Sequence, residues 1–206
     1  MSIIYRHILL YRAIMNALYF GHYKKRFNDI TALFEQEDRR VVELCFGDIY
    51  IASHCRKTGK AWIGYDMNTS FVAHAIGKGF TAQAVDLFIV ESLPAADVCI
   101  IAGSLYHFHH SLDKLFLLML ASAPKIIISE PVSNWTSRQG WVGKVSASLT
   151  NAGKGQEHFR FNRESLIQIL DYYKKKYKFS YEIQSEGKDV LIKIAHERTQ
   201  RRHTDL

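Results

Sequence analysis

The sequence predicts an α/β protein whose sheet is mostly parallel and ends in an antiparallel hairpin. From residue 39 onward, short apolar runs alternate with segments of helical periodicity, which is typical of parallel strands covered by helices on both faces. The last two runs alternate apolar with polar residues around a three-residue turn, which is typical of a hairpin. Residues 3–36 carry apolar residues at steps of three and four, which predicts an N-terminal helical cap over residues 1–38. With 206 residues, 48% hydrophobic and 23% charged, the chain is expected to form one globular domain.

The remaining elements follow from the apolar runs and their stop signals. A second helical stretch of the cap is expected at residues 27–34. The expected parallel strands are residues 41–46, 61–66, 80–87, 96–103 and 125–131. The helices expected between them are residues 49–58, 69–78 and 112–123, which are followed by Gly59, Gly79 and Pro124. The core is therefore expected to extend over residues 39–197.

The segment 132–161 interrupts this pattern. It is rich in Ser, Gly, Thr and Asn but also carries Trp and Phe, and a long irregular insertion is more often functional than idle. We therefore expect a lid over the carboxyl ends of the strands, where ligands bind in such sheets. Asn162 is expected to cap a helix over residues 163–177. The hairpin strands are expected at residues 179–185 and 189–195.

The chain is basic, with 27 Lys and Arg against 20 Asp and Glu and a net charge of +7. The positive charges gather at Lys24–Arg26, at Lys174–Lys178 and in the tail, residues 198–206. No basic run is interleaved with aromatic residues, so we expect solvated faces rather than a nucleic-acid partner. An anionic partner, including a membrane surface, stays open.

Three features bear on localisation. No run approaches the roughly 20 apolar residues that span a bilayer. The first residues lack a small-residue cleavage site, so no signal peptide is expected. Cys45, Cys55 and Cys99 lie in or beside apolar segments and are expected to be reduced thiols. A cytoplasmic protein is therefore expected, and its oligomeric state stays open.

Two acidic residues flank a turn in the pattern of a nucleotide site. The first strand leads into Glu43-Leu44-Cys45-Phe46-Gly47-Asp48, and the second ends at Asp66, 19 residues after Gly47. A tight turn lets a ligand approach the backbone, and a carboxylate after the second strand accepts both ribose hydroxyls. No G-x-G-x-x-G occurs, which excludes the usual dinucleotide fingerprint. The acidic residue before the turn favours a cationic ligand over a pyrophosphate.

These residues resemble the first motif of the class I S-adenosylmethionine-dependent methyltransferases, E/D-x-G-x-G-x-G. Glu43 stands at the acid, Cys45 at the first glycine, Gly47 at the second and Ile49 at the third. Two of the three glycines are therefore replaced, and the branched Ile49 predicts a reshaped turn. The resemblance covers most of residues 39–197 and implies a Rossmann-like, doubly wound sheet of seven strands. It implies S-adenosylmethionine as cofactor and S-adenosylhomocysteine as product.

The resemblance also implies which residues contact the cofactor. Gly47 and the adjoining backbone would line its methionine and ribose portions, and Glu43 would order the turn or the ammonium group. Asp66 would bind the ribose diol, with Met67 beside the adenine. The other implied contacts are Cys45 in the turn, Val85 and Asp86 at the adenine, and Ala102 and Gly103 near the methionine end. The alternatives are that Glu43 pairs with a lysine or caps a helix, that Asp66 caps a helix, and that Asp86 is an ordinary loop acid.

Leu105-Tyr106-His107 resembles the L-x-H that many small-molecule methyltransferases carry after the fourth strand. Methyl transfer requires alignment of the acceptor, and a base where the acceptor loses a proton. His107 is the candidate base and Tyr106 its catalytic neighbour, although a histidine at this place is equally often structural. The expected substrate contacts are Tyr11, Tyr19, His110, Glu130, Trp135 and Arg138. No metal is expected, because the histidines lack carboxylate or cysteine partners at a recognised spacing.

We therefore expect a methyltransferase that acts on a small molecule, with O-methylation favoured by the histidine. The segment AGSLYHF replaces the N/D-P-P-Y of enzymes that methylate DNA bases or protein amides. Aromatic lid residues favour a partly apolar acceptor, and Arg138 or Arg160 would suit an anionic group on it. Two alternatives stay open: a catalytically silent scaffold subunit with this fold, and a peripheral-membrane enzyme acting on a lipid-linked acceptor.

Overall fold

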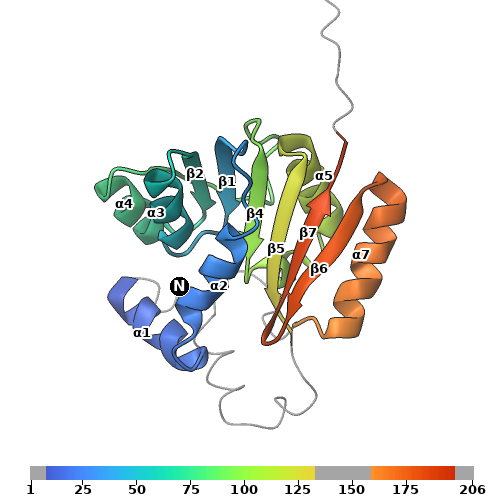
Figure 1. The fold of residues 1–206 in the computed structure, drawn as a ribbon, viewed down its shortest axis with the longest axis horizontal. Helices are drawn as coiled ribbons and strands as arrows, with labels where there is room; N and C mark the ends of the chain where they lie inside the picture. Colours follow the sequence, from blue (N-terminus) through green and yellow to red (C-terminus); the bar gives the residue numbers. More distant parts are fainter. Residues whose placement is uncertain (1–7, 133–158, 198–206) are drawn as a thin grey trace, which may run out of the picture.

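The computed structural model describes residues 8–132 and 159–197, and the structural statements below concern these residues. Their strands form one seven-stranded sheet in the order β3-β2-β1-β4-β5-β7-β6 (Figure 1). The strands are β1 (Arg40–Leu44), β2 (Ala61–Asp66), β3 (Thr81–Ala84), β4 (Val98–Ala102), β5 (Lys125–Pro131), β6 (Ser180–Glu186) and β7 (Asp189–Ala195). β1 to β5 pair in parallel, and β7 is antiparallel to both β5 and β6. The predicted sheet, mostly parallel with a terminal hairpin, is confirmed.

Helices cover both faces of this sheet. They are α1 (Ile8–Leu18), α2 (Tyr23–Thr31), α3 (Tyr50–Lys57), α4 (Thr69–Gly77), the 3-10 helix η2 (Leu105–Phe108), α5 (Leu112–Ser122) and α7 (Arg163–Tyr177). One buried core lies between the sheet and α5 and α7, and a second lies between the sheet and α2, α3 and α4. Figure 1 shows α1 beyond the lower edge of the sheet, the edge at which β5 ends and the β6–β7 turn lies. The cap therefore adjoins the carboxyl ends of the parallel strands.

The prediction that Asn162 caps the start of α7 is confirmed. The Asn162 side chain accepts a hydrogen bond from the Ser165 N–H at 2.7 Å, and the Ser165 hydroxyl oxygen accepts one from the Asn162 N–H at 3.0 Å. This reciprocal capping box satisfies two amide groups that a helix start otherwise leaves unpaired. The bounds of β2, β5 and α7 agree with the sequence prediction.

Two other predictions of bounds are wrong for local reasons. β3 ends at Ala84 rather than at residue 87, because the Asp86 carboxylate accepts from the Phe88 N–H and turns the chain. The second cap helix covers residues 23–31 rather than 27–34. Past Thr31 the amides of residues 33 and 34 donate to carbonyls three residues earlier, so the chain continues in tighter turns.

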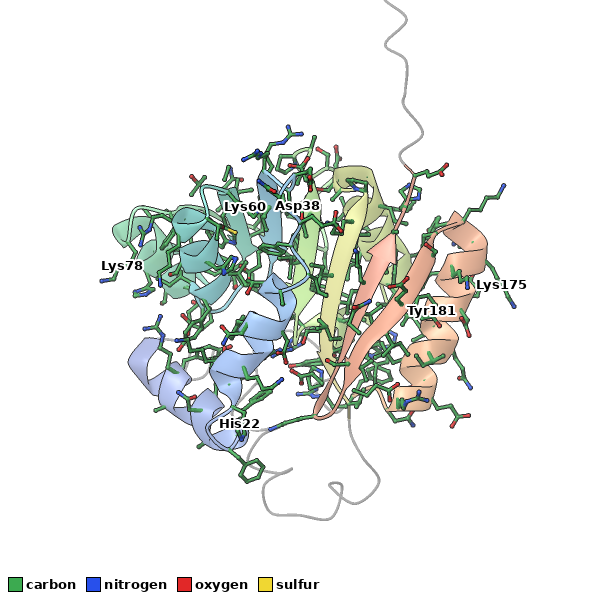
Figure 2. All side chains as sticks on the ribbon, in the orientation of Figure 1. His22, Asp38, Lys60, Lys78, Lys175 and Tyr181 are labelled. Atoms are coloured by element: carbon green, nitrogen blue, oxygen red, sulfur yellow. The ribbon has the colours of Figure 1, made fainter. Side chains whose placement is uncertain are left out.

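The basic clusters differ in their surroundings. Lys175 points away from β6 on the outer side of α7 (Figure 2), as a solvated face requires. Lys24 and Lys25 are exposed, but Arg26 is only 8% exposed and lies beneath α2. The expectation that all of Lys24–Arg26 is solvated is therefore wrong at Arg26. Within the described ranges, none of the helices combines the length and apolar character needed to cross a bilayer.

Candidate functional site

The turn after β1 brings backbone amides to the end of β2. Cys45 and Gly47 both adopt positive φ, 52° and 55°. The Cys45 N–H donates to the Tyr65 carbonyl at 2.6 Å, and the Gly47 N–H donates to Asp66 Oδ2 at 3.1 Å. Cysteine at positive φ costs about 1–2 kcal/mol relative to an unstrained residue. The turn is therefore held in place by its bonds to β2, although only one of the three motif glycines is present.

Asp66 lies at the centre of this arrangement. Its side chain is 7% exposed, and its second oxygen, Oδ1, accepts from the Asn68 N–H at 2.8 Å. Burial raises the pKa of Asp66 to about 6, against the opposing effect of its two amide donors. Each carboxylate oxygen has a further lone pair, which two vicinal hydroxyls of a ligand can use. Asn68 rather than Asp66 is the N-cap of α4, so Asp66 is not needed as a helix cap.

Glu43 lies under the turn and does not line the cavity described below. Its Oε2 accepts from the Trp62 indole N–H at 2.8 Å, while its buried Oε1 has no hydrogen-bond partner among the described residues. Burial raises the pKa of Glu43 well above its usual range, which favours the neutral acid. Its hydrogen bond goes to Trp62 of β2, so both expected roles of Glu43, ordering the turn and binding the ammonium group, stay predictions.

Helix α1 covers the turn. The Tyr11 ring packs against Phe71 with 5.0 Å between centroids, and a Cβ placed on Gly47 would lie 3.0 Å from the Tyr11 hydroxyl oxygen. Arg12 makes a bidentate ion pair with the buried Asp48, with Nε–Oδ2 at 2.8 Å and Nη2–Oδ1 at 2.6 Å. Burial raises the pKa of Tyr11 to about 12, so its phenol is neutral at physiological pH. This ion pair escaped the sequence analysis.

A cavity lies between the β1 turn, the end of β4 and the cap. Its walls include Cys45, Ala102–Ser104, His107, Tyr11 and Arg26, and its volume is about 80 Å³. Sites for small molecules and cofactors are typically about 300–1,000 Å³. The expected cofactor residues Cys45, Ala102 and Gly103 are thus brought together with His107 and Tyr106, in a space that α1 restricts.

Three further expected cofactor residues follow β2 and β3. Met67 and Val85 are half-buried, and the Val85 N–H donates to the Asp66 carbonyl at 3.0 Å. Asp86 Oδ1 accepts from the Phe88 N–H at 3.0 Å, as an ordinary loop acid does. The structure places these residues beside Asp66 along the sheet edge, and their contact with a ligand stays a prediction.

Glu130 is fully buried at the end of β5. Its Oε2 accepts from the Leu105 N–H at 3.0 Å, and its Oε1 accepts from the Tyr106 N–H at 3.2 Å. Burial raises the pKa of Glu130 to about 8. Glu130 thus binds the first two amides of η2. A substrate contact by this residue stays a prediction, since Glu130 is fully buried.

The η2 segment carries the expected catalytic pair. The Tyr106 and His107 rings have centroids 4.0 Å apart, and the Arg160 guanidinium lies 3.6 Å from the Tyr106 ring centroid. Burial, with a smaller contribution from the charge of Arg160, lowers the pKa of His107 to about 4. His107 is therefore neutral at physiological pH and has a nitrogen lone pair for a proton.

The neighbouring histidines differ from His107. His109 Nδ1 lies 3.0 Å from the Tyr106 carbonyl oxygen, and its ring stacks on Phe159 with centroids 4.3 Å apart. His110 is exposed beside it. Among the described residues, no group of three or more His, Cys, Asp or Glu side chains forms a metal site. Trp135 and Arg138, two of the expected substrate contacts, lie outside the described residues.

A charged corner at the ends of β4, β5 and β7 was missed by sequence reasoning. Arg26 pairs with Asp189 at 2.9 Å, and the Tyr19 hydroxyl donates to Asp189 Oδ1 at 3.0 Å. Tyr19, an expected substrate contact, is therefore engaged within this corner. A usable signal existed, because Arg26 falls on the apolar stripe of Tyr23, Phe27 and Ile30 rather than on the solvated face.

Comparison with solved structures shows that this fold is that of the class I methyltransferases. Magnesium protoporphyrin IX methyltransferase from Synechocystis PCC 6803, solved with SAH (S-adenosylhomocysteine), has a TM-score of 0.62 and 13% identity, covering 85% of this chain and 84% of that chain. DhpI in its complex with SAM (S-adenosylmethionine) and HEP has a TM-score of 0.64 and 12% identity, covering 94% of each chain. Human N-acetylserotonin methyltransferase with SAM has a TM-score of 0.65 and 16% identity, covering 95% of this chain and 58% of that chain. No protein-family model matches the sequence, and neither does a curated protein.

Proposed function

We propose that the protein is an S-adenosylmethionine-dependent methyltransferase that acts on a small-molecule acceptor, with O-methylation favoured. The observation that carries the proposal is the buried Asp66 carboxylate, which is bonded to the Gly47 amide at the end of β1 and β2. This carboxylate retains lone pairs for a ribose diol. It belongs to a fold whose solved examples include proteins crystallised with SAM or SAH.

The chemical types of the residues at the site suit the parts of this cofactor. When bound, the cofactor supplies an electrophilic methyl group on a sulfonium sulfur. Asp66 would hold the ribose hydroxyls, Met67 and Val85 would pack beside the adenine, and the backbone at Cys45 and Gly103 would line the methionine end. Gly47 and Gly103 both follow strand ends with positive φ, and an added Cβ would meet Tyr11 at the first and Arg26 at the second.

His107 is proposed as the residue that takes a proton from the acceptor. It lies on the cavity wall beside Gly103 and Ser104, and it is neutral at physiological pH, so its imidazole has a free lone pair. Because a pKa of about 4 makes a weak base, the role is proposed from the position of His107. The proposal predicts that His107→Ala lowers kcat about 100-fold or more with little change in SAH affinity. His54→Ala, a change on α3 away from the cavity, is the control, and equal kcat in both variants would refute the role of His107.

Cofactor binding in this proposal requires α1 to move from the β1 turn. The present cavity is about 80 Å³, and Tyr11 lies directly over Gly47. The attachment of α1 rests on a half-exposed Arg12 and on ring contacts of Tyr11, which a displacement of one helix can break together. Closure of α1 over a bound cofactor would also exclude water from the site.

The first test is isothermal titration calorimetry of the protein with SAM and SAH. The proposal predicts binding by wild type and a loss of about 1–3 kcal/mol, about 5- to 150-fold, in Asp66→Ala, because buried partners are left unpaired. Asp171→Ala, a change on the exposed face of α7, is the matched control. A folded wild-type protein that binds neither compound would refute the proposal.

A second candidate function is a methyltransferase fold that binds a protein partner without turnover. Two observations favour it: the small cavity beneath Tyr11, and the residues Cys45 and Ile49 in place of motif glycines. Failure to bind SAM or SAH, together with a stable complex with a protein partner, favours this candidate. A scaffold that binds SAM is distinguished by the absence of methyl transfer.

A further inference from the structure

The buried arginine of the cap, Arg26, lines the same cavity as Tyr11. Arg26 extends from α2 to β5 and β7, where its Nη2 donates to the Ser129 carbonyl at 2.7 Å and its Nε donates to the Ser129 hydroxyl at 3.1 Å. Asp189 Oδ2 lies 2.9 Å from the same Nε. These contacts fix the direction of the guanidinium group with three separate acceptors.

The outer edge of this guanidinium has unused donors. A Cβ built on Gly103 would lie 2.7 Å from both Nη1 and Nη2, so the end of the arginine rests over the Gly103 backbone. Nη1 donates to no acceptor among the described residues, and Arg26 is one of the residues that line the cavity. An arginine carries five N–H donors in a planar fork, and the ones left over here face the space above Gly103.

The chemistry of these donors selects a carboxylate. A guanidinium edge with paired N–H groups binds a planar carboxylate with two parallel hydrogen bonds. The acids near Arg26 are engaged elsewhere: Asp189 with Nε and with the Tyr19 hydroxyl, and Glu130 with the first two amides of η2. Within residues 8–132 and 159–197, Nη1 has no carboxylate partner, and a bound molecule can supply one.

We propose that Arg26 binds the carboxylate of a ligand held over Gly103, a role that rests on the proposed methyltransferase function. Two sources supply this chemistry: the amino-acid end of the cofactor and an acidic acceptor. The position of Gly103, at the end of β4 where the methionine portion is expected, favours the cofactor. Arg26 would then fix the end of the cofactor opposite to the one that Asp66 holds.

The experiment compares two ligands that differ in the amino-acid end. SAH carries the carboxylate, whereas 5′-methylthioadenosine has the adenosine and sulfur but no carboxylate or ammonium group. Calorimetric titrations of wild type, Arg26→Met, Arg26→Lys and the exposed control Lys24→Met give the affinities, and thermal unfolding verifies that each variant is folded. Arg26→Lys keeps the charge and keeps the test open if Arg26→Met does not fold.

The expected result is that Arg26→Met weakens SAH binding at least 10-fold, Arg26→Lys weakens it less, and 5′-methylthioadenosine binding changes less than 2-fold. If the Arg26 variants bind SAH as wild type does, benzoate is titrated into the SAH-loaded proteins as a carboxylate probe. A benzoate affinity that falls in the Arg26 variants would mean that Arg26 binds the carboxylate of the acceptor. Equal weakening of both nucleosides, or no Arg26 dependence in either titration, would overturn the proposal. Wild type that binds neither nucleoside would instead refute the methyltransferase function on which it rests.

Discussion

Two neighbouring strand ends, Gly47 after β1 and Gly103 after β4, are each covered by one side chain of the N-terminal cap. Both glycines have positive φ, 55° and 69°. Tyr11 of α1 covers the first, and Arg26 of α2 covers the second. The positions are therefore alike in backbone geometry but differ in the chemistry of the cover.

The two covers differ in how firmly they are attached. Tyr11 is half-buried, and its contacts include the Phe71 ring and a weak 3.4 Å hydrogen bond from the Tyr23 hydroxyl. Its helix is also held by Arg12, which pairs with the buried Asp48. Arg26 is buried and is bonded to β5 and β7. Removing one partner of a buried ion pair costs about 3–5 kcal/mol, whereas a partly exposed aromatic contact is worth about 0.5–1.5 kcal/mol. The comparison indicates that the Tyr11 side chain over Gly47 is held less firmly than the Arg26 side chain over Gly103.

The sharpest test of this contrast is an added methyl group at each glycine. Gly103→Ala is expected to lower the free energy of unfolding by about 3 kcal/mol, because positive φ costs about 1–2 kcal/mol and the fixed guanidinium must leave its acceptors. Gly47→Ala is expected to cost about 1–2 kcal/mol, because the Tyr11 hydroxyl at 3.0 Å can shift. Urea unfolding measures both. Equal losses would remove the distinction between a fixed and a movable cover.

The second prediction concerns pH and the charged corner at Gly103. The pKa of Glu130 is about 8 in the fold and lies near its ordinary value of 4.5 in the unfolded chain, so the folded state binds more protons between these values. The stability that Glu130 contributes is therefore complete below pH 4.5 and is lost as pH rises through 8. Above pH 6.5 His107, whose pKa is lowered, no longer opposes this trend.

We expect the free energy of unfolding to fall by about 1–2 kcal/mol between pH 6.5 and 8, up to about 1.4 kcal/mol per pH unit for one proton. Urea titrations across this range measure the change, and Glu130→Gln is expected to reduce it. Glu43, whose pKa burial also raises, contributes with the same sign in both proteins. A slope that is the same in Glu130→Gln and wild type would show that Glu130 does not carry the effect.

The smallest expected effect is at the movable cover. Tyr11→Ala is expected to tighten SAH binding about 3- to 10-fold, because a larger fraction of the protein has the β1 turn uncovered and apparent affinity scales with that fraction. Ile14→Ala on the same helix is the matched control for loss of apolar surface. Weaker binding in Tyr11→Ala would contradict this prediction and would mean that Tyr11 contacts bound SAH.

The local features of this protein could be read from the sequence. The alternation of apolar runs with helical segments predicted the parallel sheet, because each strand and helix has its own hydrophobic period. The Asn162 cap and the 19-residue spacing from Gly47 to Asp66 also follow from short-range chain geometry, and the structure shows the bond between these last two residues at 3.1 Å. Sequence reasoning therefore reached the candidate ribose end of the site.

Only the tertiary structure revealed the other end of the site, where Glu130 and Arg26 lie. The carboxylate of Glu130 was expected at a substrate, but it holds the amides of η2, which lie 24 and 25 residues earlier in the chain. Arg26 was grouped with solvated lysines, yet its acceptors on Ser129 lie 103 residues away. A charged side chain can be buried only where such partners converge. That convergence depends on which strands become neighbours, so a hydrophobic period in the sequence cannot reveal it.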